Sequence, residues 1–178
     1  MELNQQESEL FIPDGQEQDN ALSRTTELCI AAHQDDIEIM AYGPIVSCYG
    51  REDKWFTGVV VTVGAGSPRS GVYADYTDEA MKKIRAREQI QAAAIGKYSA
   101  QFLLSYPSSH VKNAKNYDVV KELAGIIEMC NPEVIYTHNF ADKHDMHVAV
   151  ALRVIAAIRM MPKDIFTSKP CRGVTWCL

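Results

Sequence analysis

The sequence predicts an α/β fold in which helices cover both faces of a mainly parallel sheet. Short apolar and β-branched segments alternate along the chain with longer segments of good helix formers. This alternation is typical of parallel strands joined by right-handed helical crossovers. The length of 178 residues suits one domain with its own apolar core. Together these observations predict a Rossmann-like three-layer sandwich, whose ligands bind beyond the carboxyl ends of the strands.

Five short segments are predicted to be the strands of this sheet: residues 27–33, 55–63, 100–106, 133–139 and 172–178. All five are largely apolar, as strands covered on both faces must be. The second is rich in β-branched residues, which favour strands. The fourth follows Pro132, which commonly lies between regular elements.

Four longer segments are predicted to be helices: residues 36–48, 77–96, 117–130 and 147–161. In the second helix, Thr77 or Asp78 can cap the first turn, and Gly96 lies where a glycine commonly ends a helix. In the first helix, Gly43 and Pro44 weaken the middle. Residues 1–24 are polar and acidic, so we predict a flexible N-terminal segment before a single domain over 25–178.

Composition excludes several classes of protein. The formal net charge is −5 and no basic block stands out, which argues against a nucleic-acid partner. The chain has no apolar run long enough to span a bilayer, and its N-terminus lacks the features of a signal peptide. The five cysteines are scattered, without a CxxC pair, as expected in a reducing compartment. We therefore expect a cytoplasmic protein, for which a homo-oligomer remains possible.

Residues that can bind metals or transfer protons gather just after the predicted strands. Because the carboxyl ends of parallel strands meet at one edge of a sheet, these residues are expected to lie together. They are His33, Asp35 and Asp36 after the first strand, His110 after the third, and His138, Asp142, His144 and His147 after the fourth. We expect His138 to support the structure and His110 to be a loop residue.

Each cluster also has a simpler interpretation. An aspartate after a strand often caps the next helix, which explains Asp35 or Asp36 but not both together with His33. The spacing of His144 and His147 places both rings on one helix face, which suits metal binding but also occurs on ordinary surfaces. Two histidines and one carboxylate would leave a metal open to water and substrate, and a second carboxylate could act as a base. The residues alone do not say which aspartate has which role.

The loop over residues 64–71 is predicted to be a connector. It is rich in glycine, serine and proline but lacks the order of a phosphate-binding or dinucleotide-binding loop. Arg69 in this loop has two interpretations. It is either a solvated loop residue or a guanidinium that holds the polar part of a substrate.

Three motifs resemble the LmbE-like (PIG-L) zinc-dependent de-N-acetylases. AHQDD at 32–36 is similar to the AHxDD motif of that family, and THNFADKHDMH at 137–147 contains its HxxH motif. Between them, Arg85, Glu88 and the AAAIG run at 92–96 match a helical R..E element. The resemblance covers roughly residues 27–160. It implies the same fold and a small-molecule substrate with an N-acetyl group, such as an N-acetylglucosamine-type sugar or its conjugate.

The resemblance also implies roles for individual residues. His33, Asp36 and His147 would bind zinc or another divalent transition metal. Asp35 would be the general base, and His144 would stabilise the oxyanion or protonate the leaving amine. Hydrolysis of another N-acylated amine, or a catalytically silent protein that only binds, remains as an alternative.

Two positions depart from the family pattern. Gln34 replaces the usual proline of the first motif, and Met146 stands where the second motif often has an aspartate. A carboxylate that orients His144 must therefore come from elsewhere, and Asp142 and Asp145 are the candidates. Family members normally continue beyond the point that corresponds to residue 178, so truncation at the C-terminus is one interpretation, which the sequence alone does not decide.

Overall fold

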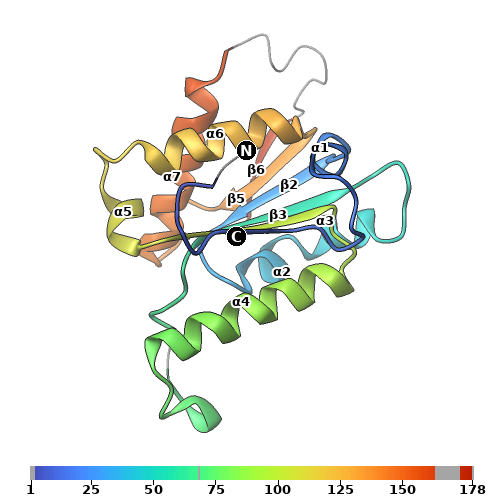
Figure 1. Ribbon diagram of the computed structural model, residues 1–178. Coiled ribbons are helices and arrows are strands. Elements are labelled where there is room, and N and C mark those ends of the chain that lie inside the picture. The colour runs from blue at the N-terminus through green and yellow to red at the C-terminus, as the bar shows by residue number, and fades with distance from the viewer. Residues whose placement is uncertain (1–2, 68, 163–172, 178) are drawn as a thin grey trace.

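A computed structural model describes residues 3–67, 69–162 and 173–177, and its centre is a six-stranded sheet (Figure 1). The strand order is β1-β4-β3-β2-β5-β6, with β1 antiparallel to its neighbour and the other pairs parallel. The strands are β1 (Glu9–Phe11), β2 (Glu27–Ala31), β3 (Phe56–Thr62), β4 (Ala100–Tyr106), β5 (Val134–His138) and β6 (Gly173–Cys177). The predicted α/β class and the five predicted strands are confirmed.

Helices cover both faces of the sheet, as the ribbon in Figure 1 shows. One layer holds α1 (Gln18–Ser23), α5 (Ser108–Lys112), α6 (Asp118–Cys130) and α7 (Asp145–Met160). The other layer holds α2 (Asp36–Met40), α3 (Tyr42–Cys48) and α4 (Asp78–Ile95). A short 3₁₀ helix, η1 (Gly71–Tyr73), lies in the loop before α4.

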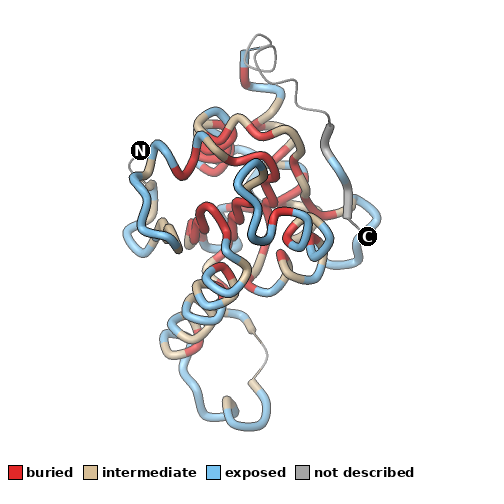
Figure 2. The backbone as a smooth tube through the Cα atoms, turned by 90° about the vertical axis from the view of Figure 1, so that its right-hand side faces the viewer, coloured by how far each residue is buried: buried red, intermediate tan, exposed pale blue. Residues whose placement is uncertain are grey.

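The central strand β2 divides the core into two apolar clusters. Leu28 and Ile30 pack with α6 and α7, whereas Cys29 and Ala31 pack with α2 and α3. This division follows from the alternation of side chains along a strand. Figure 2 shows the buried residues at the centre of the fold and the mostly exposed loop between β3 and α4 at its edge.

The order of the strands places two strand ends at a switch point. From β2 the chain proceeds to β3 and β4 on one side, whereas β5 and β6 pair on the other side of β2. Loops that leave β2 and β5 therefore diverge above the sheet, and ligands of open α/β sheets bind in the crevice between such loops. Both predicted histidine clusters follow these two strands.

The N-terminal residues differ from the predicted flexible segment. Residues 9–11 form β1 against β4, and the side chain of Leu22 in α1 is buried in the core. The hydroxyl of Ser8 donates to the carbonyl of Leu104 at 2.7 Å. The overall polarity of this segment concealed the apolar run at 10–12, which is sufficient for a short edge strand.

Two predicted helices differ in detail. The segment at 36–48 is interrupted at Ala41, which separates α2 from α3. At the end of α4, Lys97 rather than Gly96 adopts the left-handed conformation, with a φ of 52°. Tyr98 N donates to Ala93 O and Lys97 N to Ala94 O, which together form a Schellman motif. Gly96 is instead required by close packing, since a Cβ there would lie 2.5 Å from the Tyr98 ring.

Among the helices that the structure describes, none is both long enough and apolar enough to cross a bilayer.

Gly58 in β3 provides a test of this packing. An added Cβ would overlap Oε1 of Gln101 and lie 2.9 Å from Cδ1 of Ile37, so Gly58→Ala should lower the free energy of unfolding by about 1–3 kcal/mol. Gly43→Ala is the matched control, because a Cβ there meets nothing within 4 Å and alanine favours the helix. Denaturant unfolding of both variants measures the difference. A Gly58→Ala protein as stable as the wild type would contradict this packing.

Candidate metal centre

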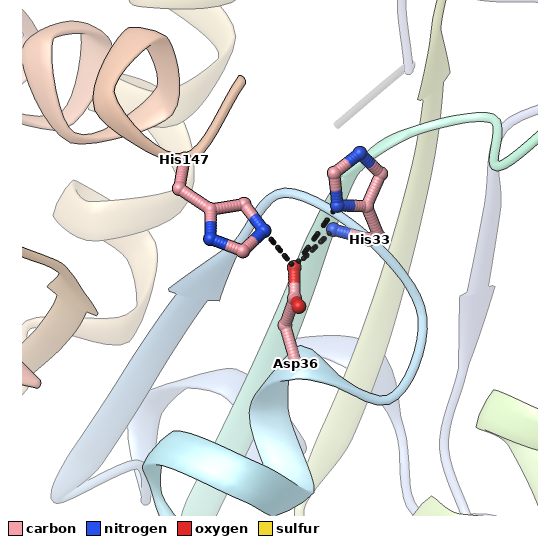
Figure 3. A group of neighbouring side chains, drawn as sticks. All are labelled: His33, Asp36 and His147. Carbon is pink, nitrogen blue, oxygen red and sulfur yellow. Dashed lines mark hydrogen bonds and ion pairs between the residues drawn. The ribbon is translucent and has the colours of Figure 1, made fainter. Parts of the chain in front are cut away.

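The candidate metal centre is built around the carboxylate of Asp36, the first residue of α2 (Figure 3). After β2 ends at Ala31, the chain turns so that Asp35 adopts a left-handed conformation with a φ of 79°. This turn brings Oδ2 of Asp36 to 2.7 Å from the backbone nitrogen of His33, which donates a hydrogen bond to it. The strand end and the start of the helix are thereby fixed to each other.

Three donor atoms have spacings that suit a tetrahedral metal. Oδ2 of Asp36 lies 3.3 Å from Nδ1 of His33 and 3.4 Å from Nε2 of His147, and all three atoms lie within 4.8 Å of one another. Ligands about 2.0–2.2 Å from a tetrahedral zinc lie about 3.3–3.6 Å apart. Both measured separations fit an edge of such a tetrahedron, so these residues suit a small divalent cation.

The charge state of Asp36 also suits a ligand. Burial acts to raise the pKa of this carboxyl, but the side-chain and backbone hydrogen bonds with His33 and the influence of His138 and His147 outweigh it. The pKa of Asp36 therefore lies below its ordinary value. A carboxyl must be ionised to bind a cation, and Asp36 meets that condition at neutral pH.

His147 is positioned by α7 and by Asp142. Nδ1 of its ring lies 2.8 Å from Oδ2 of Asp142, on the side of the ring opposite to Nε2. A carboxylate at this place fixes the proton on Nδ1 and leaves Nε2 free to bind a metal. Asp142 also accepts a hydrogen bond from the backbone nitrogen of His144 at 2.8 Å through Oδ1. One carboxylate therefore fixes both the His147 ring and the chain that leads into α7.

His138 supports the centre from beneath. Its ring is stacked on that of His147, with 4.0 Å between centroids, and its Nε2 accepts a hydrogen bond from Ala32 N at 2.8 Å. Burial lowers the pKa of His138 to about 4, so the ring is neutral at neutral pH. His138, Asp142 and His147 form a second group with donor atoms within 4.8 Å. Because these atoms are engaged with one another or with backbone, the group described above suits a metal better.

Asp35 lies at the mouth of the centre, and its side chain is 58% exposed. Its Oδ2 lies 3.0 Å from Nη2 of Arg85, and the same nitrogen donates to the carbonyl of Gln34. Arg85 belongs to α4, so this helix holds the turn that carries Asp35. Arg85 also contacts Glu88 at 3.2 Å, so the two charged residues of the predicted R..E element pair with each other beside this turn.

His144 caps the start of α7. Its Nδ1 accepts a hydrogen bond from Met146 N at 3.3 Å, which places the proton of the neutral ring on Nε2. The two carboxylates predicted to orient the His144 ring, those of Asp142 and Asp145, make their short contacts with other side chains. Asp142 contacts the ring of His147 instead, and Asp145 lies 4.0 Å from Nδ1 of His144 while it pairs with Lys112 at 2.6 Å. A backbone amide thus orients His144 where a carboxylate was expected.

Gln34, which replaces the usual proline, is buried beneath the loop after β3. Its Oε1 occupies the place where Gly64 would carry a Cβ, and Gly64 has a φ of +71°. Only glycine combines this backbone conformation with this close approach. The glutamine is thus accommodated by a glycine of the neighbouring loop.

A cavity of about 740 Å³ opens over the centre. Its walls include His33, Asp35, Asp36, His144 and His147. The cations on its wall are Lys82, Arg85 and Lys112, none of which was predicted as a site residue. Arg85 belongs to the R..E element that the sequence showed, whereas Lys82 and Lys112 have no distinctive spacing, so the sequence carries no signal for those two lysines.

Arg69 lies differently from its predicted substrate-binding place. Its guanidinium donates to the carbonyls of Ala65, Ser67 and Tyr76, and pairs with Asp78. These acceptors all belong to the loop before α4 or to its first residue. The arginine therefore holds its own loop together instead of lying in solvent, and its contact with a substrate stays a prediction.

The arrangement provides the parts of a metal-assisted hydrolytic site. Two imidazole nitrogens and one carboxylate oxygen suit a cation and leave further coordination positions for water and substrate. A second carboxylate, from Asp35, and a ring nitrogen with a proton, from His144, line the same cavity. Such groups can accept and donate protons on either side of a reacting carbon.

Solved structures share this fold. A conserved protein from Thermus thermophilus, TT1542, is 18% identical with a TM-score of 0.67, over 86% of this chain and 66% of that one. N,N'-diacetylchitobiose deacetylase from Pyrococcus horikoshii is 18% identical with a TM-score of 0.65, over 88% of this chain and 57% of that one. GalB, a 4-carboxy-2-hydroxymuconate hydratase from Pseudomonas putida KT2440, is 20% identical with a TM-score of 0.61, over 75% of this chain and 55% of that one.

These likenesses establish the fold, and this chain spans less than two thirds of the length of each of the three proteins. No curated protein sequence is significantly similar to it. The sequence model of one family, PIG-L, described as GlcNAc-PI de-N-acetylase, matches residues 28–158. That range includes both histidine clusters and most of the sheet. The chain therefore belongs to the PIG-L family.

Proposed function

We propose that this protein is a metal-dependent hydrolase that removes an acetyl group from an N-acetylated amino sugar or a conjugate of one. The observation that carries the proposal is that Asp36 Oδ2 lies 3.3 Å from His33 Nδ1 and 3.4 Å from His147 Nε2, two separations that match edges of a tetrahedral zinc site. Membership of the PIG-L family supports the same reaction. The deacetylase from Pyrococcus horikoshii, which is named for an acetylated sugar, supports the substrate class.

In this proposal His33, Asp36 and His147 hold the cation, most simply zinc. When bound there, zinc polarises the amide carbonyl and makes a nearby water more acidic. Asp35 accepts a proton from the water while the oxygen of that water attacks the carbonyl carbon of the amide. His144 donates a hydrogen bond from Nε2 to the oxygen that gains charge. The proton that Asp35 accepted passes to the nitrogen that leaves when the C–N bond breaks, and the carboxylate is regenerated. The products are acetate and the free amine.

The hydratase among the similar structures shows that the fold alone does not fix the reaction. Two other functions are therefore compared in the same experiment: hydrolysis of a different N-acylated amine, and binding without turnover. The zinc-loaded protein is incubated with N-acetylglucosamine, its conjugates and other N-acylated amines. We expect acetate from the acetylated sugars, and its loss on removal of the metal by chelation. Stoichiometric zinc without acetate release from any sugar would contradict the proposed function.

His147 provides a test of the ligand set. His147→Ala removes one of three protein ligands, so bound zinc should fall well below one per chain. Elemental analysis after dialysis measures it. His110→Ala is the matched control, because His110 is exposed and lies after β4, in α5. If His147→Ala retains as much zinc as the control, another group of residues holds the metal.

The two adjacent aspartates can be separated by their amide variants. Asp35→Asn cannot accept a proton, so kcat should fall on the order of 10²–10⁴-fold while zinc content stays unchanged. Asp36→Asn should lose zinc, because Asp36 is the proposed ligand. Zinc analysis and acetate release on both variants give the result. Retention of zinc by Asp36→Asn together with its loss in Asp35→Asn would reverse the two roles.

A further inference from the structure

A group of buried and partly buried polar side chains lies directly beneath the turn that carries Asp35. Its centre is Gln89 of α4, which is 1% exposed. Around it lie Glu38 of α2, Gln101 of β4 and Tyr98, which precedes β4. Polar groups in such a place are unfavourable unless they are hydrogen-bonded. The pattern of bonds in this group therefore shows what it holds.

Gln89 uses both the oxygen and the nitrogen of its side-chain amide, and so connects α4 to the turn and to α2. Its Oε1 accepts a hydrogen bond from the backbone nitrogen of Asp35 at 3.1 Å, and its Nε2 donates to Oε1 of Glu38 at 2.9 Å. Both partners require the same orientation of the Gln89 amide. The Asp35 nitrogen is a donor and must face the amide oxygen, whereas the Glu38 carboxylate is an acceptor and must face the amide nitrogen. Tyr98 fixes the far end, since its hydroxyl donates to Glu38 at 2.8 Å.

The backbone of Asp35 needs such support. Its φ of 79° is uncommon for a residue other than glycine, and such conformations persist only where the surroundings hold them. Arg85 and Gln89 lie four residues apart on α4, and therefore on one face of the helix. Arg85 contacts the Asp35 carboxylate at 3.0 Å, and Gln89 holds the amide from which that side chain projects.

We propose that Gln89 is a positioning residue for the general base: its side-chain amide, oriented by Glu38, holds the Asp35 peptide so that the carboxylate faces the substrate cavity. The inference rests on the proposed function, in which Asp35 accepts the proton of the attacking water. Gln89 itself is buried and does not line the cavity, and it reaches the wall residue Asp35 through the backbone nitrogen of that residue. It acts through Asp35 alone.

The consequence is an effect on turnover rather than on binding. A displaced base makes proton transfer slower, and a shift of about 1 Å can reduce the rate on the order of 10²-fold. Substrate affinity should be little changed, because Gln89 does not contact the substrate cavity. A residue that only stabilised the fold would alter the amount of folded protein and leave the kcat of that protein unchanged.

The first test is Gln89→Leu, which keeps the volume and removes the hydrogen bonds to Asp35, Glu38 and Gln101. We expect kcat for acetate release to fall on the order of 10–10²-fold, with KM and zinc content near the wild-type values. Thr25→Val is the matched control, since the hydroxyls of Thr25 and Thr57 share a buried hydrogen bond of 2.8 Å at the opposite end of the strands. An unchanged kcat in folded, zinc-loaded Gln89→Leu, or an equal fall in Thr25→Val, would overturn the inference.

The second test exchanges the polar partners. Gln89→Glu places a carboxylate against that of Glu38 and should reduce kcat. Addition of Glu38→Gln restores a donor to the pair while position 89 still accepts from the Asp35 amide. The double variant should therefore recover kcat, and a double variant as slow as Gln89→Glu would overturn the inference.

A third readout does not depend on activity. Hydrogen exchange of the Asp35 amide, followed by NMR, should be slow in the wild type and faster in Gln89→Leu than in the Thr25→Val control. Unchanged protection of the Asp35 amide in Gln89→Leu would overturn the inference, irrespective of the kcat of that variant. Absence of acetate release from the wild type would instead overturn the proposed function, so the two failures are distinguishable.

Discussion

The candidate site depends on the contacts that converge on one oxygen of Asp36. Oδ2 of this residue accepts the backbone hydrogen bond of His33 and lies 3.3–3.5 Å from ring nitrogens of His33, His147 and His138. These residues come from the ends of two adjacent strands, β2 and β5, where the strand order reverses. A single carboxylate therefore joins the loop after β2 to the start of α7.

The surrounding structure constrains both sides of this centre. On the side of β5, Asp142 fixes the His147 ring and the backbone of His144, and buried His138 stacks beneath. On the side of β2, α4 holds the strained turn at Asp35 through Arg85 and Gln89. The same helix and the loop before it form one wall of the cavity. Helix α4 thus belongs to the site although it contributes no cation ligand, and its packing against β4 determines how firmly the turn is held.

The sequence predicted the fold class and which residues gather at one edge of the sheet, but it did not predict the side chains that support them. Continuous apolar segments identified β3 and β4, because strands buried on both faces need such segments. The position of His33 and His147 just after predicted strands identified these two histidines. Periodicity missed β1, since three residues paired at a sheet edge leave no periodic pattern. The sequence left the role of Arg69 open because the acceptors that hold its guanidinium come from a loop whose conformation no local pattern specifies. Gln89 was missed because its partners are distant in sequence and meet only after folding.

The central claim is that two histidines and one aspartate at this sheet edge bind a catalytic cation. X-ray absorption at the zinc K edge of the loaded protein tests it most directly. The account predicts only nitrogen and oxygen ligands at about 2.0–2.2 Å, with the outer-shell scattering of two imidazole rings. Sulfur ligands at about 2.3 Å, or a spectrum without imidazole scattering, would contradict it.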